Sequence, residues 1–269
     1  QARPWFQYFE QAFQRWEDLS GANYVYEPND DGSTAGSSSP SGVLGVRGDL
    51  RIAGASIDGN SGTLAFNYFP DHGDMVLDTD DADGLFGNAA DNFRGLRYVV
   101  MHEHGHGFGV LHVESSTDQL LMEPFINTTF DGPQLDDVRA IQFYFGDANE
   151  KSNGGQGNGT AGNATPLGAI APGAAASVGS DADVPTQAIG STDTDFVSLA
   201  NLADTDFYSF DVDHAATVTA ILTPRGGQFT QGSEGTTPTS FNASARSDLV
   251  LAIFDINGMP VPADERCEI

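Results

Sequence analysis

The sequence predicts an α+β domain over residues 1–148, a Gly/Ala/Ser-rich linker over 149–184 and an all-β sandwich over 185–269. Three observations support this order. In the first part, segments with apolar residues at helical spacing are separated by segments that alternate apolar and polar residues. Large apolar residues almost disappear over the linker. They return afterwards as short runs between turn residues, which is typical of a sandwich.

The first expected helix covers residues 3–19, where aromatic side chains recur at helical spacing and give one wide apolar face. A loop rich in Asp, Gly and Ser follows over 29–42. Alternation predicts strands at 50–52 and 63–69, the second of them ended by Pro70.

The next expected helix is capped by Asp91 or Asn92 and runs to about Gly107. Its last turns therefore carry the start of the segment 102–112, which contains four of the chain's six histidines. A histidine-rich helix end on the surface would not explain that concentration.

The segment 102–112 spells H-E-x-x-H-x-x-G-x-x-H without a mismatch. His102 and His106 lie four residues apart on the helix, so their side chains point the same way and can bind one metal ion. Gly109 can adopt a positive φ, leave the helix and bring His112 back to the same ion. Three neutral imidazoles with an open fourth position are typical of a catalytic zinc site.

Glu103 adjoins the first ligand, where its carboxylate can reach a zinc-activated water without binding the metal. It is the predicted general base. His104 is excluded as a ligand, because an offset of two residues turns it about 200° away from His102.

This long motif is the signature of the metzincin zinc peptidases, and residues 120–124 resemble their Met-turn, with Met122 beneath the zinc ligands. Among metzincins the chain most resembles the matrixins. Residues 9–16 are similar to their first helix, 56–65 to their glycine-rich loop and edge strand, and 135–142 to their last helix. The resemblance implies a mixed sheet with an active-site helix and a C-terminal helix.

The chain also departs from the matrixin pattern. Matrixins usually carry a second, structural zinc, but the matching positions here are Phe66 and Val76, which cannot bind metal. One catalytic zinc is therefore expected. Val113 replaces a small hydroxyl residue after the third ligand, and Glu123 replaces the usual tyrosine after the Met-turn methionine.

A calcium ion is implied by the same resemblance. In matrixins it joins the glycine-rich loop to the end of the next strand, and the matching residues are Asp58, Asp78 and Asp81. A solvated acidic loop over 78–83 is the open alternative.

The resemblance further implies a substrate-binding edge strand, in which Leu64 and Ala65 offer backbone hydrogen bonds to an extended peptide. Tyr98 lies one turn before His102, where matrixins shape the pocket for the residue after the cleaved bond. A medium-depth apolar pocket with Glu123 at its rim is expected.

Composition limits the partners. With 38 acidic against 11 basic residues, the net charge of −27 disfavours nucleic acid and anionic membrane surfaces. No apolar run reaches the roughly 18 residues needed to cross a bilayer, so no membrane insertion is expected. The single cysteine, Cys267, cannot form an intrachain disulfide. We expect a secreted, extracellular monomer whose leader lies upstream of Gln1.

Three segments of the third region, 204–212, 216–222 and 248–255, resemble the bacterial pre-peptidase C-terminal domain, an accessory β-sandwich of secreted peptidases. Strands expected after Gly258 are missing, so this domain is expected to be truncated.

The expected function is that of a zinc endopeptidase acting on protein or peptide substrates. The alternative is an adhesion protein that binds an envelope or a polymer and whose zinc domain processes only its own chain. Cleavage of an unrelated protein distinguishes these two functions.

Overall fold

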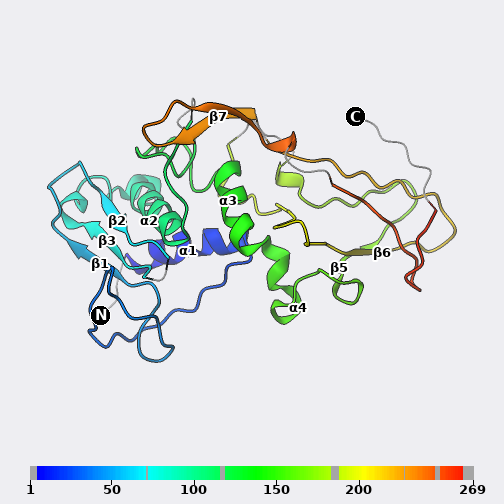
Figure 1. The fold of residues 1–269 in the computed structure, drawn as a ribbon, viewed down its shortest axis with the longest axis horizontal. Helices are drawn as coiled ribbons and strands as arrows, with labels where there is room; N and C mark the ends of the chain where they lie inside the picture. The colour runs from blue at the N-terminus through cyan, green and yellow to red at the C-terminus, as the bar shows by residue number, and fades with distance from the viewer. Residues whose placement is uncertain are drawn as a thin grey trace.

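The structure, a computed structural model, describes residues 5–70, 72–115, 119–182, 188–226, 228–245 and 249–262. Cys267 lies outside these ranges. Figure 1 shows the longer helices and the first sheet at one end of the molecule and a more extended C-terminal part at the other. In the described part of the chain, no helix combines the length and apolar character needed to cross a bilayer.

The helices are α1 (Phe6–Leu19), α2 (Arg94–Gly107), α3 (Leu135–Phe145) and the irregular turn α4 (Ser152–Gly155). The strands are β1 (Ile52–Ala55), β2 (Ala65–Asn67), β3 (Met75–Asp78), β4 (Val113–Ser115), β5 (Thr165–Ala169), β6 (Tyr208–Asp211), β7 (Gln228–Ser233) and β8 (Thr239–Asn242). Short 3-10 turns include η1 (Thr79–Asp81), η2 (Ala89–Asp91), η3 (Ala148–Lys151), η4 (Ala161–Asn163), η5 (Ser180–Ala182) and η6 (Ala243–Ala245).

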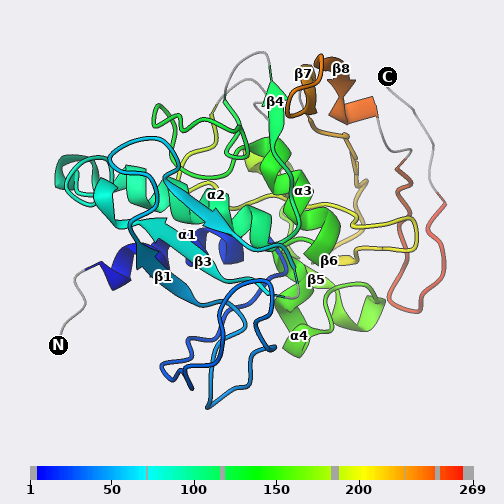
Figure 2. The ribbon, with the colours of Figure 1, turned by 60° about the vertical axis from the view of Figure 1, so that its left-hand side comes forward.

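The first sheet is mixed and has the order β1-β3-β2, with β1 parallel and β2 antiparallel to β3. In Figure 2 the three strands lie in front of α1 and α2. Phe66 and Val76, the two positions that match the structural-zinc histidines of matrixins, are cross-strand partners. Neither side chain carries an atom that binds metal.

The helices α1 and α2 pack together around Trp16, which is 1% exposed and donates from its indole Nε1 to the carbonyl of Met101 at 3.1 Å. The aromatic spacing of α1 predicted this buried face. The N-cap residue of α2 is Phe93, which makes no side-chain cap hydrogen bond, so the predicted cap by Asp91 or Asn92 is wrong. Asp91 Oδ1 nevertheless accepts from the amide of Arg94, the first residue of the helix, at 3.2 Å. Asn92 itself has a left-handed backbone, with φ of 58°.

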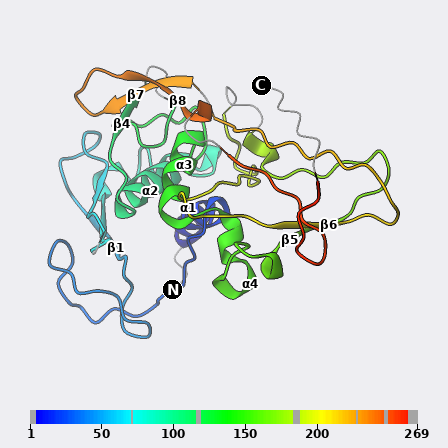
Figure 3. The same ribbon diagram turned by 45° about the vertical axis from the view of Figure 1, so that its right-hand side comes forward.

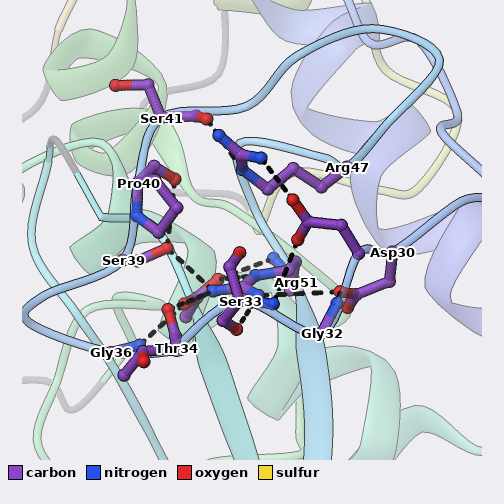
Figure 4. Close-up of polar contacts among 12 residues, drawn as sticks. Asp30, Gly32, Ser33, Thr34, Gly36, Ser39, Pro40, Ser41, Arg47 and Arg51 are labelled. Carbon is purple, nitrogen blue, oxygen red and sulfur yellow. Dashed lines mark hydrogen bonds and ion pairs between the residues drawn. The ribbon is translucent and has the colours of Figure 1, made fainter.

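A long segment without regular strands or helices, residues 20–51, is held by one buried ion pair. Arg51 Nη2 lies 3.0 Å from Asp74 Oδ2, and Asp74 is 2% exposed. Figure 4 shows the guanidinium surrounded by the loop that precedes it. Its acceptors there are Ser33 O at 2.8 Å, Thr34 O at 2.9 Å and Ser39 Oγ at 2.8 Å.

The β-sandwich expected over 185–269 is not seen in the described residues. Strand β6 pairs with β5, which lies inside the expected linker, and the hairpin β7–β8 pairs with β4 of the first domain. No strand forms over 216–222. Alternating residues become strands only where a neighbour supplies ladder hydrogen bonds, and here the neighbours come from earlier in the chain. Ile221 remains 82% exposed and Val250 87% exposed.

The segment 188–198 packs against the first domain. Ile189 and Phe196 are 6% and 4% exposed and form a small core with Leu19 and Val138. Arg15 donates from Nη1 and Nη2 to the carbonyls of residues 193 and 190, at 2.8 and 2.9 Å.

The hairpin β7–β8 lies beside β4 and α3, at a distance from β5 and β6 (Figure 3). Strand β7 is antiparallel to β4. The guanidinium of Arg139 on α3 lies 4.8 Å from the ring centroid of Phe241 on β8. The hairpin is thereby brought next to β4, which directly follows His112.

Candidate metal centre

Three histidines converge at the end of α2. His112 Nε2 lies 3.1 Å from His102 Nε2 and 3.0 Å from His106 Nε2. One ligand atom from each of the three residues lies within 4.8 Å of the others. Nitrogen ligands of a tetrahedral zinc, each about 2.0–2.1 Å from the metal, lie roughly 3.3 Å apart. The observed spacing therefore fits a shared zinc ion.

The other ring nitrogen of each histidine faces a hydrogen-bond acceptor, so each Nδ1 carries the proton and each Nε2 presents a lone pair. Three facing lone pairs repel one another unless a cation lies between them. The acceptors are Leu121 O for His102 at 2.7 Å, Val110 O for His106 at 2.8 Å and Glu234 Oε2 for His112 at 2.8 Å.

Burial favours the neutral ligands. It lowers the pKa of His102 to about 3, and the neighbouring His106 lowers it further. Burial likewise lowers the pKa of His106. Neutral imidazole is the form that binds metal.

Gly109 allows the return of the chain, as its position in the motif predicts. Its φ is 97°, a conformation that L side chains rarely adopt. His104, by contrast, lies on the other side of α2, where its Nε2 is 2.7 Å from the hydroxyl of Tyr24. Its ring packs edge-on against Phe13. The exclusion of His104 as a ligand agrees with this position.

Glu103 is 7% exposed, and its carboxyl accepts a hydrogen bond from the main chain of Asn67 on β2. Burial raises the pKa of Glu103 to about 7, and the Asn67 bond opposes this shift. A carboxylate with a pKa near neutrality is suited to take up and release a proton.

The Met-turn, residues 120–124, lies against α2. Met122 is 1% exposed, and its Sδ occupies the space that a Cβ at Gly105 would need. The carbonyl of Leu121 in the same turn accepts from His102. The turn therefore lies beneath the three converging histidines and supports His102.

Asp137 on α3 is a supporting residue that the motifs did not indicate. It is 3% exposed and accepts main-chain hydrogen bonds from Leu121 at 2.8 Å, Met122 at 3.2 Å and Gln134 at 2.8 Å. Burial raises its pKa to about 7, against the effect of these amides. The available signal was its place at N3 of α3, in a capping box with Gln134.

Tyr98 and Glu123, predicted at the substrate pocket, are both buried, at 1% and 4% exposed. The Tyr98 hydroxyl lies 3.2 Å from Leu121 O, and its ring stacks on His102 with 16° between the planes. Glu123 Oε1 accepts from the amide of Ser115 at 2.7 Å. In this structure both side chains support the site from inside.

Ala65 begins β2, an edge strand of its sheet among the described strands, and Leu64 directly precedes it. Glu103 contacts the same strand at Asn67. The predicted substrate-binding strand therefore runs next to the predicted general base.

Asp58, Asp78 and Asp81 come together around the glycine-rich loop, but they do not form one of the clusters found among the described residues with ligand atoms within 4.8 Å. Their carboxylates instead accept from loop and turn amides. Asp58 accepts from the amide of Thr63, and Asp81 accepts from the amide of Ser61. Asp78 accepts from the amides of Ile57, Asp58 and Asp80. Calcium at this place stays a prediction.

Comparison with known proteins agrees with the zinc motif. The sequence model of the matrixin family matches residues 4–146. The chain is similar to matrix metalloproteinase-25 of Mus musculus, with 34% identity over 105 residues, or 36% of this chain. That match covers 17% of the length of the mouse protein.

The family match spans the first sheet, α1, α2 and α3, together with all three converging histidines and the Met-turn. A catalytic zinc is what this family implies, and the histidine cluster has the ligands to bind it. The chain belongs to the matrixin family of zinc peptidases.

Proposed function

We propose that this protein is a secreted zinc-dependent endopeptidase that hydrolyses peptide bonds in protein or peptide substrates, with Glu103 as the general base. The observation that carries the proposal is the convergence of three imidazole Nε2 atoms, 3.0–3.1 Å apart for two of the pairs, beside a buried carboxylate. Membership of the matrixin family supports the same reaction class.

When bound, zinc polarises the scissile carbonyl and lowers the pKa of a water molecule toward neutrality. Glu103 takes the proton of that water and passes it to the leaving amine. Its buried position and raised pKa suit both transfers, since the same group must accept and then donate a proton.

The substrate is proposed to extend along β2, with Leu64 and Ala65 offering main-chain hydrogen bonds at the edge of the sheet. Burial of Tyr98 argues for a pocket whose walls are set by neighbouring main chain rather than by the tyrosine itself. Calcium bound by Asp58, Asp78 and Asp81 is proposed to stabilise the loop before this strand.

The test is Glu103→Gln, which keeps the size of the side chain but removes its ability to accept the proton. We expect the variant to retain one zinc per chain and to lose about 10²–10⁴-fold in kcat/KM on casein. Glu10→Gln, an exposed change on α1, is the matched control and should retain full activity.

Two results would contradict the proposal. Activity of Glu103→Gln close to that of the control would remove the role of general base. Failure of the zinc-loaded wild-type protein to cleave casein or any other unrelated protein would favour the alternative, self-processing function.

A further inference from the structure

A second cluster of possible metal ligands lies outside the zinc site. It consists of Glu150 on η3 and of Asp204 and Asp206, just before β6. One carboxylate oxygen from each lies within 4.8 Å of the other two. Two oxygens that bind one calcium ion at 2.3–2.6 Å can be up to about 5 Å apart, so a single ion can contact all three.

The fold brings these carboxylates together from distant parts of the sequence. Glu150 follows the end of α3, whereas Asp204 and Asp206 arrive more than fifty residues later, where β6 pairs with β5. Asp204 Oδ2 accepts from the amide of Ala200 at 2.7 Å, which fixes its loop. Among the described residues, none of the three forms an ion pair with Lys, Arg or His.

Asn158 supplies an independent sign of a ligand. Its side chain is 0% exposed, and neither Oδ1 nor Nδ2 has a hydrogen-bond partner. Its main-chain carbonyl accepts from Phe207 at 2.9 Å, which holds Asn158 beside Asp206. A Cβ on the preceding Gly157 would lie 2.5 Å from Glu150 Oε2, so the same turn also adjoins Glu150.

Other buried polar atoms around this turn are also without partners. They are Asp206 Oδ1 and the hydroxyl of Tyr208. Burial raises the pKa of Tyr208, and the charges of Asp206 and Asp147 add to this, whereas the side chain of Asn158 opposes it, because it approaches the phenol without reaching the distance and angle of a normal hydrogen bond. The amide, the phenol and the carboxylate therefore share one small volume. Buried polar groups in native proteins are almost always paired, so several orphans together indicate a missing partner.

The negative charges of the cluster also indicate a missing cation. Burial raises the pKa of Asp206 to about 7, and the like charges of Asp147, Asp204 and Glu150 raise it further. A bound cation would remove both the repulsion and the orphaned lone pairs.

We propose that Glu150, Asp204, Asp206 and the Oδ1 of Asn158 bind a calcium ion. All the ligand atoms are oxygens, which calcium prefers, and no imidazole or thiolate is present to select zinc. Calcium also accepts the irregular arrangement and the extra water ligands that four protein groups leave room for. The ion would fasten the segment before β6 to the end of the peptidase domain.

The test is calorimetric titration of calcium into the calcium-depleted, zinc-loaded full chain. We expect Asp204→Asn/Asp206→Asn to bind one calcium fewer than the wild type. Asp211→Asn/Asp213→Asn removes the same charge from exposed positions nearby and should bind as the wild type does. Asn158→Ala changes no charge and should weaken binding at this site by more than about tenfold, since affinity follows the number of ligands.

Zinc content and circular dichroism check that each variant is folded. If the double variant is unfolded, Asp206→Asn alone replaces it in the same titration. Equal calcium stoichiometry in wild type and carboxylate variant would overturn the site. An Asn158→Ala variant that binds calcium as tightly as the wild type would also overturn the site. It would show that calcium binds a diffuse acidic surface and that Asn158 is not a ligand. Tighter binding of magnesium than of calcium would overturn the choice of ion.

Discussion

At the scale of single residues, the orientation of each histidine in the cluster depends on the hydrogen bond of its Nδ1. His102 and His106 donate to main-chain carbonyls of the Met-turn and of the turn after α2. His112 instead donates to the carboxylate of Glu234, which lies 122 residues further along the chain. A side chain can be replaced without changing the backbone, so Glu234 offers a direct test of this orientation.

Glu234→Ala should weaken zinc binding by about tenfold, the lower end of the range for residues that orient metal ligands. The lower end is expected because the Glu234 side chain is 59% exposed, which lets water take its place in part. Competition with a chromophoric zinc chelator measures the change. Glu234→Gln keeps an acceptor oxygen and should restore most of the affinity. Equal affinity in the Ala variant and the wild type would show that His112 needs no such partner.

At the scale of elements, α3 supports the histidine cluster without contributing a histidine to it. The carboxylate of Asp137 binds the amides of the Met-turn, and the Met-turn in turn supports His102 and α2. The connection runs from helix to turn to ligand through hydrogen bonds that are all buried. Loss of one acceptor would therefore affect both stability and ligand position.

Asp137→Asn should destabilise the protein by about 1–3 kcal/mol, because an amide has one oxygen for three main-chain donors. Denaturant unfolding at pH 8, where the native carboxylate is ionised, measures the loss. Asp136→Asn, at the neighbouring and partly exposed position, should change stability by less than about 1 kcal/mol. A similar effect of the two changes would argue against the supporting role of Asp137.

The junction between η3 and β6 predicts a pH dependence in the calcium-free protein. The pKa of Asp206 in the folded protein, about 7, lies above the ordinary aspartate value of 3.8. Its protonation therefore favours the fold fully below about pH 4, and this contribution is lost as the pH rises through 7. Asp147, Glu150, Asp204 and Tyr208 are the titratable groups that face it.

The side chain in Asp206→Asn cannot ionise. When calcium is absent, the melting temperature of this variant minus that of the wild type should therefore be larger at pH 8 than at pH 5. Adding calcium at pH 8 should reverse the order, because only the wild type keeps the full ligand set. Thermal melts of the two proteins at both pH values measure the difference. A constant difference across this range would show that Asp206 does not titrate there.

At the scale of the whole molecule, the segment 188–198 packs on the first domain, although it lies beyond the predicted boundary at residue 148. Ile189 and Phe196 bury Leu19 and Val138, and the Gln134 side chain exchanges hydrogen bonds with the main chain of Ile189. Burial of each large apolar side chain stabilises a fold by about 1.5–3 kcal/mol. The segment 188–198 is therefore part of the stable unit in this structure.

A chain cut after residue 148 should consequently melt at a lower temperature than one cut after residue 202. The shorter chain exposes the apolar surface around Leu19 and Val138 and leaves Arg15 without its two carbonyl partners. Circular dichroism melts of the two zinc-loaded fragments provide the comparison. Equal midpoints would place the boundary at residue 148, as the composition of the sequence predicts.

The sequence alone determined the features whose partners lie close together along the chain. The zinc ligands fall within eleven residues, so helical spacing and one positive-φ glycine are enough to predict their convergence. The hydrogen bond from the amide of Arg94 to Asp91 at the start of α2 is equally local. Aromatic spacing predicted the buried face of α1, although not its contact with Met101.

Only the tertiary structure decided the contacts between distant residues. The ion pair of Arg51 with Asp74, the support of the Met-turn by Asp137 and the approach of Glu234 to His112 carry no motif. The C-terminal segments that alternate apolar and polar residues illustrate the same point. Alternation predicts that a segment forms a strand, but it does not predict which strand it pairs with. Here β6 pairs with β5, and β7 pairs with β4, because hydrogen-bonding edges in the earlier part of the chain lie within reach.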